Sequence, residues 1–339
     1  MELNYKNLKF FSLIFYFLFH QNVYSGAYSS FSPSYLHSES ASIMSMGVAI
    51  NSISSLYSNP SLLLSSNRNL VDLSLALPFS ESKSGALLPT SAGFFVNYEN
   101  QWGYGVRVKQ SLYKNFPFED KNYTYTSSVF ISYALMPKLK ISGGVGPSSL
   151  FRNNVQSNYS WTYFSSISFE HERHHLGLSL ESFGSFKLEG YRGSDSLKER
   201  LPELLLFGYL YKLSTNYTFY GEARRLFYER SVFDLNGENA KPKLDRGLGA
   251  ELQLSGGILT NLNEKWSLRT GMEYSGIYDS NGKNLKSIGL GLGFSYKIFE
   301  EEEESYRLHF SIQRIGLYSK SGGRNPETML YLSASSLIY

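Results

Sequence analysis

Three histidines lie close together in the sequence and could in principle bind a metal ion. They are His171, His174 and His175, and neutral imidazole is a common zinc ligand. Adjacent residues of a strand point to opposite faces, so His174 and His175 would not share one site. No carboxylate pattern surrounds them, and the chain has no cysteine, which excludes zinc–thiolate chemistry. We therefore predict a turn here, with no metal and no cofactor.

A run of five glutamates and many serines are the other groups that could do chemistry. Residues 300–304 could bind a cation or a basic periplasmic partner, but such a run is typical of a solvated turn. A serine nucleophile needs a histidine base beside it, and no nucleophile motif frames any serine of this chain. The sequence thus predicts a protein that is not an enzyme.

Four phenylalanines could instead line an apolar pocket. Each lies on the face opposite to a set of apolar residues suited to contact lipid, among them Phe94 and Val129. The four are Phe95, Phe130, Phe164 and Phe183. Burying one such ring against a lipid tail is worth about 1.5–3 kcal/mol. We predict these residues as ligand-binding, and the alternative is that they pack against another segment of the chain.

These phenylalanines belong to segments in which apolar and polar residues alternate, the period of a strand with one face in an apolar medium. The clearest is residues 287–298, where every second residue is large and apolar. Alternation alone would also suit a water-soluble sandwich. Most segments, however, run to about eleven residues, which matches the roughly 9–11 of a tilted membrane strand and exceeds the roughly five or six of soluble strands.

Fourteen such segments predict an all-β fold, an antiparallel transmembrane barrel over residues 69–339. Short turns follow the even-numbered segments and longer loops follow many odd ones, as expected when tight turns and both chain ends face the periplasm. The last strand ends on Tyr339, and this aromatic end resembles the signal that the barrel-assembly machinery binds. The predicted strands are 69–79, 89–99, 101–112, 123–135, 138–150, 157–170, 174–189, 201–212, 215–230, 247–262, 265–278, 285–299, 305–319 and 327–339.

The composition agrees with export to a membrane. The 339 residues are 42% hydrophobic and 18% charged, with a mean hydropathy of −0.25, too polar for a bundle of membrane helices. Aromatic residues make up 16% of the chain, and Tyr and Trp suit a membrane interface. The apolar run 10–19 is too short to span a bilayer and predicts a signal peptide over residues 1–25. A net charge of +3 without a basic block argues against a nucleic-acid partner.

Residues 26–68 do not alternate and form a separate segment, rich in serine and poor in charge. We predict a short helix around residues 44–56. Proline at position 60 pushes Asn59 out of the helical conformation and ends the helix, and on the residues alone Asn59 and Pro60 are either functional or a connecting turn. Glycines on the presumed inner face of the strands, such as Gly291, would let another segment approach the wall. They indicate a filled lumen.

The stretch from Gly47 through a serine-containing turn to Tyr57, Asn59 and Pro60 resembles the N-terminal segment of the long-chain fatty-acid transporter (FadL-like) family. Ser61 stands where that family has Ala, and one extra residue separates the aromatic ring from Asn. The resemblance implies fourteen strands, a luminal hatch over residues 26–68 with Gly47, Asn59 and Pro60 as its motif, and passive uptake of hydrophobic compounds such as long-chain fatty acids. The sequence shows no obvious long external loops for an outer binding groove.

Two other functions remain open at this point. Relatives of the same superfamily serve secretion or scaffolding without solute flux, and a small-solute porin would also be a barrel. We expect a monomer in the outer membrane of a diderm bacterium, with membrane lipids, hydrophobic small molecules and the barrel-assembly machinery as partners.

Overall fold

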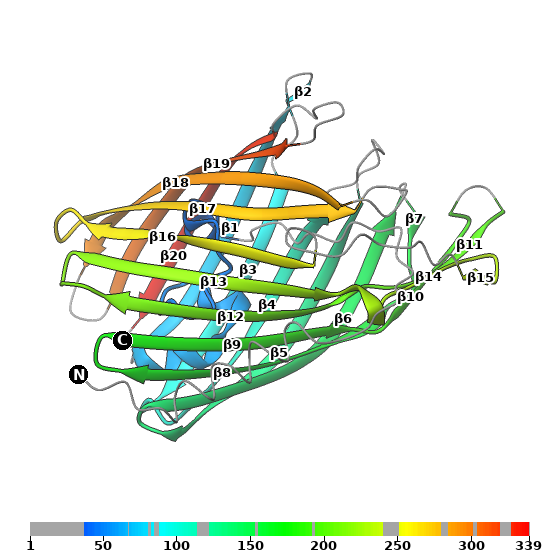
Figure 1. Ribbon diagram of the computed structural model, residues 1–339. Helices are drawn as coiled ribbons and strands as arrows, with labels where there is room; N and C mark the ends of the chain where they lie inside the picture. The colour runs from blue at the N-terminus through cyan, green and yellow to red at the C-terminus, as the bar shows by residue number, and fades with distance from the viewer. Residues whose placement is uncertain are drawn as a thin grey trace, which may run out of the picture.

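The structure, a computed structural model, describes residues 37–66, 68–80, 83–84, 88–113, 122–152, 155–191, 194–239, 251–278, 284–300, 304–318 and 327–338. Its long strands form one closed antiparallel barrel (Figure 1). The first strand pairs with the next long strand on one side and with the last on the other, which closes the ring. The fourteen strands are β1 (Asn69–Ser80), β3 (Leu88–Tyr98), β4 (Trp102–Tyr113), β5 (Asn122–Met136), β6 (Leu139–Arg152), β8 (Ser160–His171), β9 (His174–Phe183), β12 (Glu203–Lys212), β13 (Tyr217–Phe227), β16 (Leu252–Asn261), β17 (Trp266–Tyr278), β18 (Asn284–Glu300), β19 (Glu304–Tyr318) and β20 (Glu327–Ile338).

The outer surface of the barrel carries the apolar residues of each strand. Val129, Ile131, Met272 and Leu290 are between 58% and 63% exposed, an arrangement that only a lipid environment makes favourable. Aromatic rings gather where the wall ends, and Trp102 stacks on Tyr98 with ring centroids 4.3 Å apart. The predicted transmembrane barrel is confirmed, and its outward surface fits the outer membrane.

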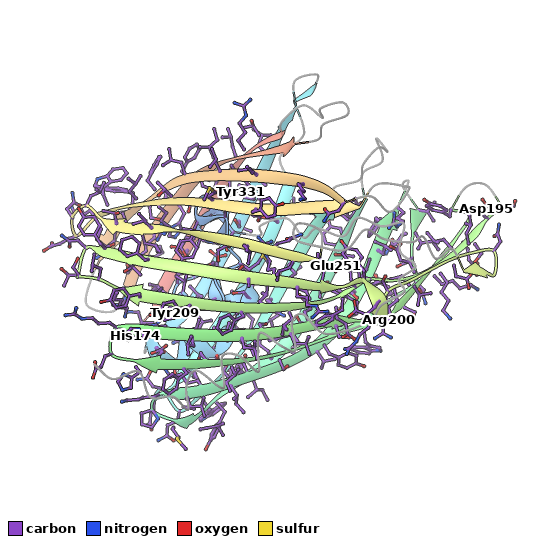
Figure 2. All side chains as sticks on the ribbon, viewed as in Figure 1. His174, Asp195, Arg200, Tyr209, Glu251 and Tyr331 are labelled. Atoms are coloured by element: carbon purple, nitrogen blue, oxygen red, sulfur yellow. The ribbon has the colours of Figure 1, made fainter. Side chains whose placement is uncertain are left out.

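The tight turns between consecutive barrel strands, such as β3–β4, β5–β6 and β8–β9, lie at one end of the barrel, together with the start of β1 and the end of β20. The β3–β4 turn shows why they are short: Glu99 and Asn100 have φ angles of 50° and 59°, the conformation of a type I′ hairpin turn. The predicted alternation of short and long connections is therefore correct, and this end is the expected periplasmic side. Figure 2 shows His174 and Tyr209 at this end and Asp195 at the far opposite end.

The expectation that long external loops are absent is wrong. Connections opposite the tight turns form a second antiparallel sheet, which extends beyond the barrel rim in Figure 1. Two predicted strands, 174–189 and 215–230, ran across its borders: the first divides at Gly184, and the second ends in the 3-10 helix η2 (Tyr228–Arg230). The sheet consists of β10 (Ser185–Glu189), β11 (Ser196–Arg200), β14 (Val232–Leu235) and β15 (Glu238–Asn239). Two-residue strands β2 (Lys83–Ser84) and β7 (Val155–Gln156) extend β1 and β6.

Residues 37–66 lie inside the ring of strands, where the blue ribbon runs in Figure 1. This luminal segment contains α2 (Ser38–Ile43), α3 (Ser55–Ser58) and the 3-10 helix η1 (Pro60–Ser66). The helix predicted over residues 44–56 is wrong. Met44 and Gly47 have φ angles of 54° and 79°, so α2 ends at Met44 and the chain then turns. Among the described residues no helix is long and apolar enough to cross a membrane, and the expected signal peptide lies outside them.

Candidate functional site: the barrel lumen

The luminal segment is held by charged side chains of the wall. Glu222 of β13 accepts hydrogen bonds from three consecutive backbone N–H groups, those of Met46 (2.8 Å), Gly47 (3.1 Å) and Val48 (3.2 Å). The hydroxyl of Ser45 donates to the same carboxylate at 2.8 Å. Positive φ at Gly47 turns these N–H groups toward one point, so the loop forms a small anion-binding nest. The nest also explains why residues 45–48 are not helical.

Asp72 of β1 provides a second attachment. Tyr57 donates a hydrogen bond to one carboxylate oxygen at 2.7 Å, and His37 Nε2 lies 3.1 Å from the other. The backbone N–H of Glu39 donates to His37 Nδ1 at 3.0 Å. This nitrogen therefore carries no proton, and Nε2 is the donor to Asp72. All three side chains are buried, so the cluster joins the start of α2 and the end of α3 to one wall strand.

Glu39 forms a third attachment, to β17 and β19 of the wall. Its carboxylate lies 2.5 Å from the guanidinium of Arg269 on β17 and 3.5 Å from His309 of β19. Burial raises the pKa of Glu39, but Arg269 and then His309 lower it by more, so the net pKa falls below its usual value. The carboxylate is charged, and α2 is tied to the wall by an ion pair.

The predicted hatch motif lies at the centre of these attachments. Asn59 donates a hydrogen bond to the carbonyl of Val48 at 2.7 Å, which closes the loop that begins at Gly47. Its amide also lies 3.3 Å from the carbonyl of Ile167 on β8, and Ser61 donates to Asn59 Oδ1 at 2.6 Å. Pro60 is the first residue of η1, a position that needs no N–H donor. The motif residues hold the segment together and against the wall.

Wall glycines make the close approach possible. A Cβ atom at Gly177 would fall on the carbonyl of Val48, and one at Gly271 or Gly291 would fall on the backbone of residues 41–43. The inference from the sequence that these glycines admit another chain segment is thus correct at these positions. Only glycine lets two backbones pack this closely.

Replacing Gly177 with alanine is expected to displace the loop at residues 47–49, because the new methyl group and the Val48 carbonyl cannot occupy one place. Amide hydrogen exchange of this loop should rise measurably. Gly221→Ala is the matched control, since a Cβ there meets nothing closer than Ser255 O at 3.8 Å. Equal exchange in the two variants would show that the approach at Gly177 is not a constraint.

The four predicted phenylalanines are all buried inside the barrel, between 0% and 5% exposed. Three of them form a row along the wall, with ring centroids 6.0 Å apart for Phe95 and Phe130 and 6.1 Å apart for Phe130 and Phe164. These rings lean over Gly103, Gly105 and Gly144 of neighbouring strands. The row contacts the luminal segment through the Arg107 guanidinium, which lies 3.5 Å above the ring of Phe164 and donates to the Tyr57 carbonyl at 2.6 Å.

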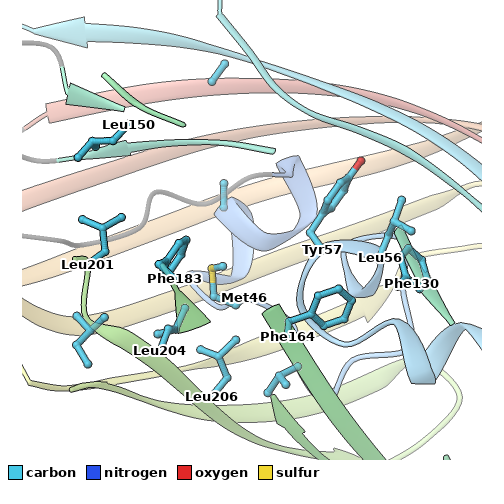
Figure 3. Close-up of a cluster of buried hydrophobic side chains, with 14 of the residues drawn as sticks. Met46, Leu56, Tyr57, Phe130, Leu150, Phe164, Phe183, Leu201, Leu204 and Leu206 are labelled. Carbon is cyan, nitrogen blue, oxygen red and sulfur yellow. The ribbon is translucent and has the colours of Figure 1, made fainter. Parts of the chain in front are cut away.

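Phe183 lies apart from this row, toward the external sheet. Figure 3 shows it beside Met46 of the luminal segment and Leu204 and Leu206 of β12. The same buried cluster continues into the external sheet through Phe186 and other residues. Its further members at this end of the barrel are Leu188 and Leu197 of the external sheet, Leu150 of β6, Leu226 of β13, Tyr228 of η2, and Tyr191 and Leu201 of the connecting segments. An apolar interior therefore connects the external sheet with the luminal segment.

The remaining predicted groups do not join this site. His175 is buried, whereas His174 points to the other face and its Nδ1 lies 2.7 Å from the hydroxyl of Tyr209. No group of three or more His, Asp or Glu side chains in the described ranges is placed to hold a metal ion. Tyr339 and residues 301–303 of the acidic run lie outside the described residues.

No motif in the sequence points directly to Glu222, Asp72, Arg269 or Arg107 as contacts of the luminal segment. One indirect signal exists: these charges stand within strands whose opposite face is strongly apolar. A charge in the interior of a membrane barrel needs water or a partner. Such residues could have been identified as wall contacts, though not paired with particular residues of the segment.

Comparison with solved structures finds the same architecture in a FadL homologue and in toluene transporters. A FadL homologue of Pseudomonas aeruginosa is 13% identical with a TM-score of 0.65 over 92% of this chain and 99% of that one. The toluene transporters TodX of Pseudomonas putida and TbuX of Ralstonia pickettii are each 12% identical. Their TM-scores are 0.64 and 0.60, over 91% and 90% of this chain and 99% and 98% of theirs. No protein-family model and no curated protein matches the chain. The chain therefore has the fold of FadL-type transporters, as the resemblance of its N-terminal segment implied.

Proposed function

We propose that this protein is a channel for passive uptake of hydrophobic compounds, such as long-chain fatty acids, across the outer membrane. The observation that carries the proposal is the continuous buried apolar cluster from Leu188 and Phe186 of the external sheet to Met46 of the luminal segment. Molecules with apolar surface would gain by contact with these side chains, because burying apolar surface away from water is favourable. No energy source and no catalytic step are involved.

In this proposal the luminal segment acts as a hatch. Most of its side chains from His37 to Leu64 are buried, and ion pairs attach them to the wall, so the barrel does not offer an open aqueous path past this segment. This arrangement favours the hydrophobic channel over a small-solute porin. The four phenylalanines take different roles: Phe183 contacts the compound, while Phe95, Phe130 and Phe164 form the apolar wall behind the hatch.

Uptake by liposomes tests the proposal. Vesicles that contain the refolded protein should take up a fluorescent long-chain fatty acid faster than protein-free vesicles and should not take up a small sugar. Sugar entry alone would indicate a porin, and entry of neither compound would favour the secretion-associated or scaffolding function.

A polar residue within the apolar cluster should slow this uptake. In Phe183→Asn an amide would interrupt the surface over which the compound passes, at a cost of about 1–3 kcal/mol when it lacks a partner, so uptake should fall at least severalfold. The matched control is Phe169→Asn, because Phe169 is 39% exposed on the outside of β8 near the tight turns. Equal rates in the two variants would exclude Phe183 from the route.

A further inference from the structure

A buried ion pair crosses the interior of the barrel. Lys109 of β4 donates to the carboxylate of Glu181 of β9, and both residues are buried, with exposed fractions of 3% and 8%. Strands β5, β6 and β8 lie between β4 and β9 in the sheet, which separates these two strands by about 19 Å along the wall. The contact therefore runs across the lumen and not along the wall.

The wall beneath this ion pair carries short side chains. Lys109 is the cross-strand partner of Thr126 on β5, and Thr126 is that of Ser148 on β6. Thr162 of β8 donates a hydrogen bond to Ser148 at 2.8 Å, and all three short side chains are buried. Because they extend only a short way into the lumen, the two long charged side chains can meet above them.

The ion pair lies between the apolar cluster of the external sheet and α3 of the luminal segment. Phe183, which contacts the compound in the proposed route, follows Glu181 by two residues and so shares its face of β9. Toward the tight turns, Arg107 precedes Lys109 by two residues on β4 and donates to the Tyr57 carbonyl at 2.6 Å. A compound that moves from Phe183 toward α3 therefore passes the ion pair.

The nearest other charge has partners of its own. Arg107 acts electrostatically on Lys109, but its guanidinium donates to Ser128 at 3.2 Å and lies over the ring of Phe164. Within the part of the chain that the structure describes, Lys109 and Glu181 bind each other. An uncharged compound can replace neither charge, so it must separate the pair in a buried interior, where an unpaired charge is costly.

We propose that the Lys109–Glu181 ion pair is a gate on the route from the external sheet to the luminal segment, and that its separation limits the rate at which uncharged apolar compounds pass. This inference rests on the proposed function and assigns two residues that select its cargo. The gate acts before the hatch, because the compound meets Lys109 and Glu181 before it reaches α3.

Dye uptake by cells can test the gate. The protein is expressed in the outer membrane of a diderm host, and entry of the uncharged apolar dye phenylnaphthylamine is followed by its fluorescence, with the rate of the host alone subtracted. Lys109→Met/Glu181→Met removes both charges and keeps two long side chains, and apolar replacement of a buried ion pair is generally tolerated by the fold. The dye should enter about tenfold faster or more through this variant than through the parent protein.

The matched control is Lys187→Met/Glu189→Met, which removes an exposed ion pair of 2.7 Å from β10 of the external sheet and should leave the rate unchanged. Equal rates for the parent protein and Lys109→Met/Glu181→Met, both above the rate of the host alone, would overturn the gate and leave the proposed function standing. No entry above that rate through either protein would overturn both.

A reversible cross-link provides a second test. The chain has no cysteine, so Lys109→Cys/Glu181→Cys introduces its only two thiols. A cleavable bifunctional thiol reagent that bridges them should slow dye entry severalfold, and reduction of the bridge should restore the rate. A bridge that forms without slowing the dye would overturn the gate. Absence of a bridge would overturn the geometry on which the gate rests, because the two side chains would then not meet across the lumen.

Discussion

Deleting residues 38–58 is expected to convert the protein into an open pore, with single-channel conductance in planar bilayers about tenfold higher or more. In the structure α2 lies beside β16–β20 and α3 beside β3 and β4, and the segment is almost entirely buried. The wall behind it carries serines and charged groups, among them Ser311, Ser333 and Arg269. Water can hydrate these groups once the segment is gone, as in barrels with a water-filled channel.

The barrel itself should survive this deletion. β1 pairs directly with β20 and β3, and no strand of the ring pairs with residues 38–58. A matched control removes a similar length of backbone from outside the lumen, such as the β10–β11 connection with its flanking residues, and should leave the conductance low. An unchanged current after deletion of residues 38–58 would mean that this segment does not block the lumen.

The barrel was predictable because each strand must follow one local rule, the alternation of apolar side chains toward lipid with small or polar ones toward the lumen. In β18 every second residue is apolar and faces lipid while Ser287, Gly291 and Ser295 face inward, and a shift by one residue would reverse both faces. The rule fails where strands leave the membrane. β9 and β10 were predicted as one strand because Phe183, Phe186 and Leu188 are all apolar. At Gly184, however, the chain passes from the barrel to the external sheet. Outside the membrane, burial comes from a soluble core, which alternation does not distinguish from a lipid-facing surface.

The lumen was less predictable because its contacts join residues far apart in the chain. The motif residues Gly47 and Asn59 could be identified, but Glu222 lies more than 170 positions away from the loop that it binds. The missed helix boundary has the same origin, since hydrogen bonds to that carboxylate replace those that a helix would form between residues 44 and 52. Tertiary contacts thus override local propensity at this loop.

Replacing Glu222 with alanine is expected to loosen the luminal segment more than any other single wall substitution of its size. The change leaves the N–H groups of Met46, Gly47 and Val48 buried without their acceptor, at about 1–3 kcal/mol for each group. It also removes the acceptor of the Ser45 hydroxyl. The free energy for opening this loop should fall by several kcal/mol, which corresponds to about 100-fold faster amide exchange or more at these residues.

Conductance and a graded set of variants separate this effect from general destabilisation. Glu222→Ala should show brief channel openings, and Glu222→Gln, which keeps one acceptor oxygen, should lie between it and the parent protein. Glu203→Ala is the matched control, because Glu203 pairs with Arg200 and Arg230 at the external rim rather than with the luminal segment. If the amide hydrogens of residues 46–48 exchange at the same rate in Glu222→Ala and Glu203→Ala, the Glu222 carboxylate does not hold the loop. The segment's position would then depend on Asp72, Arg107 and Arg269, since these wall charges also contact the luminal segment.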